Sequence, residues 1–178
     1  IQFWTNRTDH RSENIVIRGN VLNSAAGPWT QTIFMRNEVV DAQGGGPEMF
    51  YRNILIEENL ILNAHLHGIT VGETNGLIIR RNTMIQNRAS AGENVQRMLW
   101  MPQINIKPDS KRVQVVGNIT HKLSGYDGQP GWTVRDVLFI QNEGRVSKRQ
   151  GLHYSRVFVG GGEGGPPGVL STWKLIPG

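Results

Sequence analysis

Short apolar runs alternate with polar positions along the chain, and one seven-residue phrase occurs five times. Its first copy is NIVIRGN at residues 14–20, where an apolar triplet stands between polar residues. The other copies are NILIEEN (53–59), GLIIRRN (76–82), RVQVVGN (112–118) and DVLFIQN (136–142). This alternation predicts short strands with one buried side, and no segment follows the 3.6-residue period of a helix.

The copies return at the spacing of a solenoid. Their last residues are Asn20, Asn59, Asn82, Asn118 and Asn142, so the intervals are 39, 23, 36 and 24 residues. A turn of about 23 residues that carries only short strands favours a parallel β-helix over helical repeats, which need about 33 residues or more. The two long intervals then contain the same turn plus an insertion.

An asparagine after each strand suits such stacked turns. At a corner it tolerates left-handed backbone geometry, and its amide can hydrogen-bond to the equivalent amides of the neighbouring turns, about 4.8 Å away. We therefore expect a ladder of corner asparagines beside inward-facing apolar ladders. The residues expected to face inward are Ile15 and Ile17, Ile54 and Ile56, Leu77 and Ile79, Val113 and Val115, and Val137 and Phe139.

Two further short strands are expected after each corner. The second strands fall at 21–22, 60–62, 83–85 and 119–120, and the third strands at 32–36, 68–71 and 104–107. Residues 1–4 resemble a third strand whose turn began earlier, so we expect the numbering to start inside a longer protein. Three strands and three corners in each turn predict a triangular coil.

The NIxIxxNxI repeat resembles that of the right-handed parallel β-helix proteins of the pectate-lyase-like superfamily. That superfamily includes polysaccharide lyases, uronan epimerases, glycoside hydrolases and bacteriophage tailspikes. The resemblance implies an all-β, right-handed parallel β-helix with three strands per turn over residues 1–144. It leaves the chemistry open, because the repeat consists of core and corner residues.

Residues 145–178 do not continue the repeat; they contain two strand-like segments around a Gly/Pro-rich link. The last turn of a solenoid exposes its core and its strand edges, so we expect this segment to be a C-terminal capping arm or an oligomerisation arm. Tailspikes that resemble this architecture are commonly trimers. The resemblance therefore admits a homotrimer or a larger assembly.

The composition narrows the function classes. The 178 residues fit one domain, and the net charge of +5 is spread along the chain, with no consecutive basic run longer than two residues. A nucleic-acid partner is therefore not expected. Because the chain has no cysteine and no long apolar segment, neither disulfides nor membrane insertion is predicted, and no motif indicates a cofactor.

The outward positions of the third strands gather the candidate chemistry. With Ile33, Ile69 and Ile104 facing inward, the outward rows become Gln2/Phe34/Thr70/Asn105, Trp4/Arg36/Gly72/Lys107 and Asn6/Glu38/Thr74/Asp109. A groove for an acidic sugar chain needs this mixture of an aromatic ring, cations and carboxylates. The alternative is that any water-exposed β-helix face carries charges without forming a site.

Four of these residues are the candidate catalytic groups: Arg36, Lys107, Glu38 and Asp109. In lyase chemistry a cation neutralises the uronate carboxylate, and a base removes the proton at C5. Six residues are the candidate substrate contacts: Trp4, Phe34, Asn105, His67, Trp100 and Tyr51. His65 and His67 point the same way in an extended chain, but no third ligand has a suitable spacing, so no metal site is predicted.

The two insertions, residues 39–52 and 88–103, are expected to form walls of a cleft or contacts with a neighbouring subunit. Their aromatic residues, with Trp29 and Trp132, either stack on sugars or are buried at such contacts, and the sequence leaves both interpretations open.

The leading hypothesis is a polysaccharide-binding β-helix at a virion surface or in the extracellular space, with or without cleavage of the glycan by lyase or hydrolase chemistry. The alternative is a structural solenoid without enzymatic activity inside a larger assembly. An enzyme needs the four candidate catalytic residues within reach of one sugar. A structural part would instead bury Trp100 and the C-terminal arm against neighbours.

Overall fold

The computed structural model describes residues 1–23, 31–63, 65–86 and 101–141, and three short strands beyond them. Sheet A contains β1 (Gln2–Thr5), β4 (Ile33–Asn37), β7 (His67–Val71), β10 (Gln103–Ile106) and β13 (Leu123–Ser124). Sheet B contains β2 (Glu13–Arg18), β5 (Tyr51–Glu57), β8 (Thr74–Arg80), β11 (Lys111–Val116) and β14 (Trp132–Arg135). Sheet C contains β3 (Val21–Asn23), β6 (Leu60–Leu62), β9 (Thr83–Ile85), β12 (Ile119–Thr120), β15 (Leu138–Gln141) and β16 (Leu152–His153).

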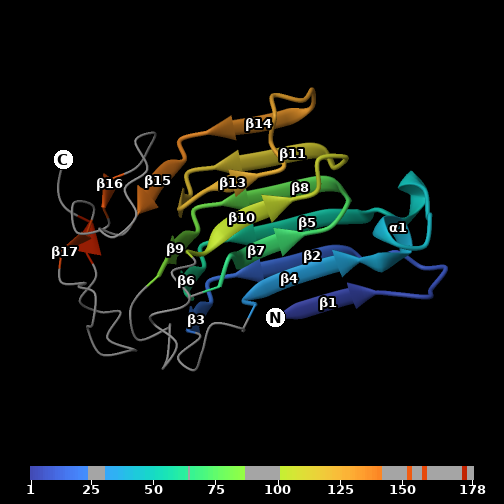
Figure 1. Ribbon diagram of the computed structural model, residues 1–178, viewed down its shortest axis with the longest axis horizontal. Helices are drawn as coiled ribbons and strands as arrows, with labels where there is room; N and C mark the ends of the chain where they lie inside the picture. Colours follow the sequence, from blue (N-terminus) through green and yellow to red (C-terminus); the bar gives the residue numbers. More distant parts are fainter. Residues whose placement is uncertain are drawn as a thin grey trace.

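The chain visits the three sheets in a fixed order, so that β4, β5 and β6 form one rung and β7, β8 and β9 form the next. Each strand pairs in parallel with the equivalent strand one rung away. In Figure 1 the strands of successive rungs lie side by side, from blue β1 to orange β14. The predicted parallel β-helix with three strands per rung is confirmed.

The core consists of inward ladders from all three sheets. In sheet B, Ile15, Ile54, Leu77 and Val113 are in register, as are Ile17, Ile56, Ile79 and Val115. Sheet A adds Ile33, Met35, Ile69, Val71, Ile104 and Ile106, all buried. Parallel strands stacked in this way place equivalent apolar side chains on top of one another, so each rung buries the apolar surface of the next.

The fifth rung differs from the prediction. Trp132 and Val134 stand in register with Val113 and Val115, so they hold the inward positions expected for Val137 and Phe139. The apolar residues of the DVLFIQN phrase belong instead to the corner and to β15, so the phrase does not form the inward strand of this rung. Trp132 is a buried core residue whose Nε1 donates a hydrogen bond to the Ser110 carbonyl at 2.7 Å, so it is not placed to stack on a sugar.

The predicted asparagine ladder closes the corner between sheets B and C. The side-chain amide of Asn20 donates to Oδ1 of Asn59 at 2.9 Å, that of Asn59 to Asn82 at 2.9 Å, and that of Asn82 to Asn118 at 3.0 Å. Each accepting oxygen also receives the backbone N–H of the donor asparagine. The ladder therefore satisfies polar groups that the packed rungs remove from water. At the fifth rung Val137 holds the ladder position, because Leu138 pairs with Ile119 and its N–H donates to the Asn118 carbonyl, so the expectation of Asn142 as the fifth member is wrong. Asn142 itself lies outside the described residues.

The left-handed residue at this corner precedes the asparagine, contrary to the expectation. Gly19, Glu58, Arg81 and Gly117 have φ angles of 66°, 57°, 53° and 63°. The sharp bend falls one residue early because the asparagine must present both its backbone N–H and its side chain to the neighbouring rung. Glu58 and Arg81 adopt a backbone conformation that is unfavourable for residues other than glycine.

A short helical turn and a 3-10 turn interrupt the second rung: α1 (Glu38–Asp41) and η1 (Pro47–Met49). Near the end of the chain, β16 extends sheet C in parallel with β15, while β17 (Phe158–Val159) pairs antiparallel with β18 (Lys174–Leu175). The rest of residues 145–178, and also Trp29 and Trp100, lie outside the described residues. Within the described part of the chain, no helix has the length and apolar character needed to cross a membrane.

Candidate functional site

The outward face of sheet A carries the rows that the sequence indicated. Trp4 is in register with Arg36, and Gln2, Phe34, Thr70 and Asn105 form one row across four rungs. Successive residues of a strand point to opposite faces, so both rows lie on the side away from the core. Neighbouring members of a row are about 4.8 Å apart, the distance between paired strands.

Trp4, Arg36 and Glu38 contact one another on this face. The indole Nε1 of Trp4 donates a hydrogen bond to Glu38 Oε2 at 2.8 Å, and the Arg36 guanidinium lies 5.3 Å from the centroid of the Trp4 ring. Arg36 Nη2 is also 3.2 Å from Glu38 Oε1. Although the Trp4 residue is 57% exposed, these contacts hold its ring in one orientation.

Two further carboxylates, which the sequence did not single out as site residues, complete what we call the charged cluster. Asp41 Oδ2 lies 3.6 Å from both Arg36 Nε and Lys107 Nζ. Lys107 Nζ is also 3.8 Å from Glu73 Oε1. Only 7% of the Glu73 side chain is exposed, and its second oxygen is buried without a hydrogen bond. The members of the charged cluster are Trp4, Arg36, Glu38, Asp41, Glu73 and Lys107.

The second rung's insertion builds the charged cluster. The chain leaves β4 at Asn37 and turns at once into α1, which supplies both Glu38 and Asp41. The Asn37 side chain donates to the Met49 carbonyl at 2.9 Å and so ties the insertion to the corner. Gly72 lies beneath this turn, where a Cβ atom would be 2.9 Å from the Asn37 nitrogen. Only glycine therefore lets α1 lie this close to the third rung.

Tyr51 supports the cluster from within, which corrects its assignment as a substrate contact. Its ring is fully buried, and its hydroxyl accepts a hydrogen bond from Thr5 Oγ1 at 2.8 Å and donates one to the Arg36 carbonyl at 2.9 Å. Burial raises the pKa of this hydroxyl above its usual value, and the Glu73 and Asp41 carboxylates raise it further. A ring without exposed surface cannot stack on a sugar.

The row expected beyond the cluster does not form as predicted. Thr74 is the first residue of β8 and is completely buried, with its N–H donating to Ser110 Oγ. Asp109 lies in the exposed turn before β11 and forms no ion pair among the described residues. The strand periodicity ends at the corner, so positions beyond it no longer share a face. Arg36, Lys107 and Glu38 come together, whereas Asp109 does not join them.

A second group of polar side chains lies on the same face at the start of the strands. His67 Nδ1 is 2.7 Å from Thr70 Oγ1, and its ring meets that of Phe34 edge-on, with centroids 5.3 Å apart. Asn105 donates to the same Thr70 hydroxyl at 3.1 Å. Burial lowers the pKa of His67, with a smaller contribution from the charge of His65. We call His67, Thr70 and Asn105 the polar row, and the Phe34 ring packs beside it.

The contacts of the charged cluster bear differently on the two chemistries that the sequence left open, lyase and hydrolase. Arg36 and Lys107 are both paired with carboxylates of the protein itself, so neither can neutralise a uronate without exchanging its partner. The cluster holds three carboxylates and two cations. Paired carboxylates are the groups that hydrolyse glycosidic bonds, through one acid and one base or nucleophile. Within the described residues, no set of three or more His, Asp or Glu side chains could hold a metal ion.

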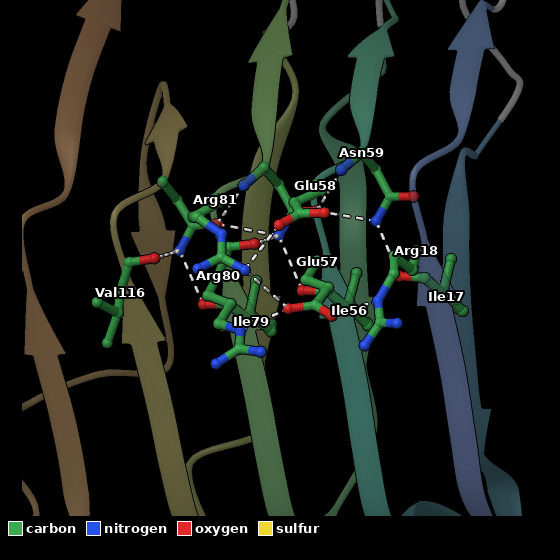
Figure 2. A network of polar contacts seen from close by, with 12 residues as sticks. Ile17, Arg18, Ile56, Glu57, Glu58, Asn59, Ile79, Arg80, Arg81 and Val116 are labelled. Atoms are coloured by element: carbon green, nitrogen blue, oxygen red, sulfur yellow. Dashed lines mark hydrogen bonds and ion pairs between the residues drawn. The ribbon is translucent and has the colours of Figure 1, made fainter.

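A network of opposite composition lies on the outward face of sheet B, next to the asparagine ladder (Figure 2). Glu57, whose side chain is 2% exposed, receives hydrogen bonds from Arg18 and Arg80 and lies 3.3 Å from Arg81 Nη2. Arg81 also contacts Glu58 at 2.7 Å. The hydrogen bond from Arg80 and then that from Arg18 hold the pKa of Glu57 below its usual value, although burial opposes them.

Comparisons with protein-family models, curated proteins and solved structures found no match to this chain. The architecture is therefore established by the strand pairing alone, and the resemblance to the pectate-lyase-like superfamily rests on the repeat.

Proposed function

We propose that the protein binds a polysaccharide along the outward face of sheet A, with Trp4 as the platform for one sugar ring. The observation that carries this proposal is an exposed indole held by a hydrogen bond to Glu38 and by the Arg36 guanidinium. A solvated aromatic ring fixed from two sides loses little conformational freedom when a sugar packs against it. Such a ring beside carboxylates and amides offers both an apolar contact and hydrogen-bond partners for hydroxyl groups.

The polar row extends this surface across neighbouring rungs. His67, Thr70 and Asn105 are partly exposed and lie on the strands that carry the cluster. Their hydroxyl, imidazole and amide groups offer both donors and acceptors, as a chain of hydroxylated rings requires. A linear glycan that crosses the strands would meet a new row member at each rung.

If the protein cleaves its glycan, the cluster favours hydrolysis over lyase chemistry. Glu38 and Asp41 are both partly accessible carboxylates. Lyase chemistry would need a cation without a carboxylate partner, and both cluster cations have partners. By this proposal the protein belongs among the carbohydrate-active or carbohydrate-recognising β-helices, such as the pectate-lyase-like superfamily. It would then act at a virion surface or in the extracellular space, with a homotrimer or a larger assembly as the proposed oligomeric state.

A panel of neutral and uronate-containing polysaccharides tests the proposal, with binding followed by Trp fluorescence and isothermal titration. Trp4→Ala should weaken binding about tenfold or more, since a central aromatic contact contributes more than about 1.4 kcal/mol. The affinity of Trp4→Phe should lie between those of the unchanged protein and Trp4→Ala. Val21→Ala changes a residue that is equally exposed, at 59%, on sheet C, and should leave affinity unchanged.

The products formed when the protein is incubated with the same polysaccharides distinguish hydrolysis, lyase cleavage and binding without cleavage. New reducing ends without ultraviolet-absorbing unsaturated ends indicate hydrolysis, and their loss in Glu38→Gln or Asp41→Asn assigns the carboxylates. Binding without products leaves recognition alone. If no glycan binds, the proposal is wrong, and the protein is a structural solenoid of a larger assembly.

A further inference from the structure

The outward face of sheet B contains a cavity of about 390 Å³ that the proposed function does not use. Its floor consists of the half-buried aliphatic side chains Leu55 and Ile78, which are in register on β5 and β8. Its lining also includes Gly76 and three polar side chains: Asn53, Arg112 and Gln114. Convergent polar groups around an apolar floor are the usual composition of a ligand site.

The missing side chain of Gly76 keeps this cavity open. A Cβ atom at Gly76 would lie 3.3 Å from Asn53 Oδ1 and 3.5 Å from Arg112 Nη2, so the amide and the guanidinium face the same space. The Gly76 backbone has a φ of 89°, which side chains rarely allow. Arg112 is held in place by a 2.8 Å hydrogen bond from its Nε to Asn75 Oδ1.

Arg112 differs from the cations of sheet A because it forms no ion pair among the described residues. Its surroundings are also cationic. Asp136 pairs with Arg135 beside the cavity. The paired strand positions there, with Arg112 itself, hold six cations and two carboxylates: Arg18, Arg52, Arg80, Lys111, Arg112, Arg135, Glu13 and Glu57. An anionic group at the cavity would therefore gain a direct partner and a favourable long-range field.

We propose that this cavity binds a sugar unit that bears a carboxylate or sulfate group. The Arg112 guanidinium pairs with the anionic group, the amides of Asn53 and Gln114 bind hydroxyls, and Leu55 and Ile78 pack against the apolar side of the ring. Nucleic acid is the less suitable polyanion. The outward residues of β5, β8 and β11 include no aromatic side chain on which a base could stack.

The test uses isothermal titration and NMR shift mapping with four probes of similar length. They are an oligogalacturonate, a heparin-derived oligosaccharide, a neutral malto-oligosaccharide and an oligothymidylate. We expect binding of the oligogalacturonate, the heparin fragment or both, with shifts at Asn53 and Gln114, and no binding of the neutral probe. The two anionic sugars separate carboxylate from sulfate recognition.

Arg112→Gln should weaken this binding about 10- to 100-fold, because a hydrogen bond to a charged group contributes about 1.5–3 kcal/mol. Gln114→Glu is a second variant at an exposed position that places a carboxylate of nearly the same shape beside Arg112, and it should weaken binding similarly. Arg135→Gln removes the same charge on the same sheet but outside the cavity, and should cost less than about threefold.

Three outcomes would overturn the proposal. The first is equal losses for Arg112→Gln and Arg135→Gln, which indicate a diffuse field without a site. The second is oligothymidylate binding as tightly as the sugars, which indicates a general polyanion surface. The third is failure of both anionic sugars to bind. Trp4→Ala should not alter binding at this cavity, so the result is independent of the sheet A proposal.

Discussion

The charged networks on sheets A and B both place carboxylates beneath more exposed cations, but carboxylates outnumber cations on sheet A and cations outnumber carboxylates on sheet B. On sheet A, the Glu73 carboxylate is buried and that of Asp41 is partly accessible, and the more exposed Lys107 contacts both. On sheet B, the buried Glu57 carboxylate lies beneath the more exposed Arg18 and Arg80. Long cationic side chains can keep their charge near water while their stems cover a buried acid. Three carboxylates therefore hold two cations on sheet A, whereas Glu57 alone contacts three arginines on sheet B.

The two networks also have different origins in the chain. Arg18, Glu57 and Arg80 occupy the same register position on three successive rungs, so the repeat itself brings them together. On sheet A, two of the carboxylates come from α1, an insertion found in one rung. A change to the repeat should therefore affect the whole molecule, and a change to the insertion should act on sheet A alone. The predictions below follow this distinction, from the largest effect to the smallest.

Asn82→Ala breaks the repeat at the centre of the ladder, beside the Glu57 network. Asn82 is fully buried, donates to Asn118 and to the Ile56 carbonyl, and accepts from Asn59. Its loss leaves several buried polar groups without partners, at about 1–3 kcal/mol each, so we expect a loss of roughly 3–5 kcal/mol in the free energy of unfolding. Denaturant unfolding measures this loss.

The control for that variant is Asn20→Ala, at the first position of the ladder. Asn20 is partly exposed and has an asparagine on one side only, so its removal should cost about 1 kcal/mol. Equal losses at the two positions would show that the ladder does not act as a continuous buried row.

Tyr51→Phe tests the connection between the core and the sheet A cluster. The substitution removes the buried hydroxyl that accepts from Thr5 and donates to the Arg36 carbonyl. We expect a loss of about 1–3 kcal/mol, because both partners stay buried without it. Tyr126→Phe removes a hydroxyl from a residue that is 41% exposed and should be nearly neutral. A neutral Tyr51→Phe would contradict the bridging role of this hydroxyl.

The ladders are predictable from the sequence wherever a rung lies between two other rungs, because the same residue type is then needed at the same position in each. Asn59 and Asn82 each bind asparagines above and below, so the requirement for that residue is visible as a repeat. It disappears at the fifth rung, where Val137 takes the corner position that asparagine holds in the four earlier rungs and directly precedes β15. DVLFIQN then resembled the repeat by chance of composition, and a single sequence offered no means to reject it.

The site was predicted less completely, for a related reason. Strand alternation correctly placed Trp4 beside Arg36, because paired strands fix the register. It could not place Asp41, which reaches the cluster from a helical turn, or Glu73, which follows the end of β7. Strand alternation therefore does not reveal that carboxylates pair with Arg36 and Lys107, so it makes both cations look available to a substrate.

Acid should affect the histidines of sheet A before the Glu57 network. The folded-state pKa values of His65 and His67 lie below their usual value because of burial. The unfolded chain then binds more protons as the pH falls below about 6.5, so stability decreases from that point downward. The folded-state pKa of Glu57 is also lowered, and its contribution is present above the unfolded pKa and is lost only as the pH falls through the folded one.

Unfolding midpoints between pH 7.5 and pH 5.5 measure this difference. His67→Gln should flatten the decrease, because it removes a group whose protonation opposes folding. Glu57→Gln should lower stability at both ends of the range without changing the slope. If Glu57→Gln flattens the slope and His67→Gln does not, the assignment of acid sensitivity to sheet A is wrong.

Asp41→Asn should have the smallest effect on stability and is the sharpest test of the comparison. It leaves the charged cluster with two carboxylates and two cations, and it removes a partner of both Arg36 and Lys107. Partly exposed ion pairs contribute about 0–1 kcal/mol, so the fold should tolerate the change.

The same variant should also change binding, and an Arg112→Gln background removes the sheet B site from this measurement. In that background, Asp41→Asn should bind oligogalacturonate about two- to fivefold more tightly, because a cation released from Asp41 can pair with a sugar carboxylate at a comparable energy. Asp136→Asn makes the same change in net charge outside the cluster, where, among the described residues, its ion-pair partner is Arg135. An equal gain in Asp136→Asn would mean that net charge, and not the arrangement of carboxylates around Arg36 and Lys107, keeps anionic sugars away from sheet A.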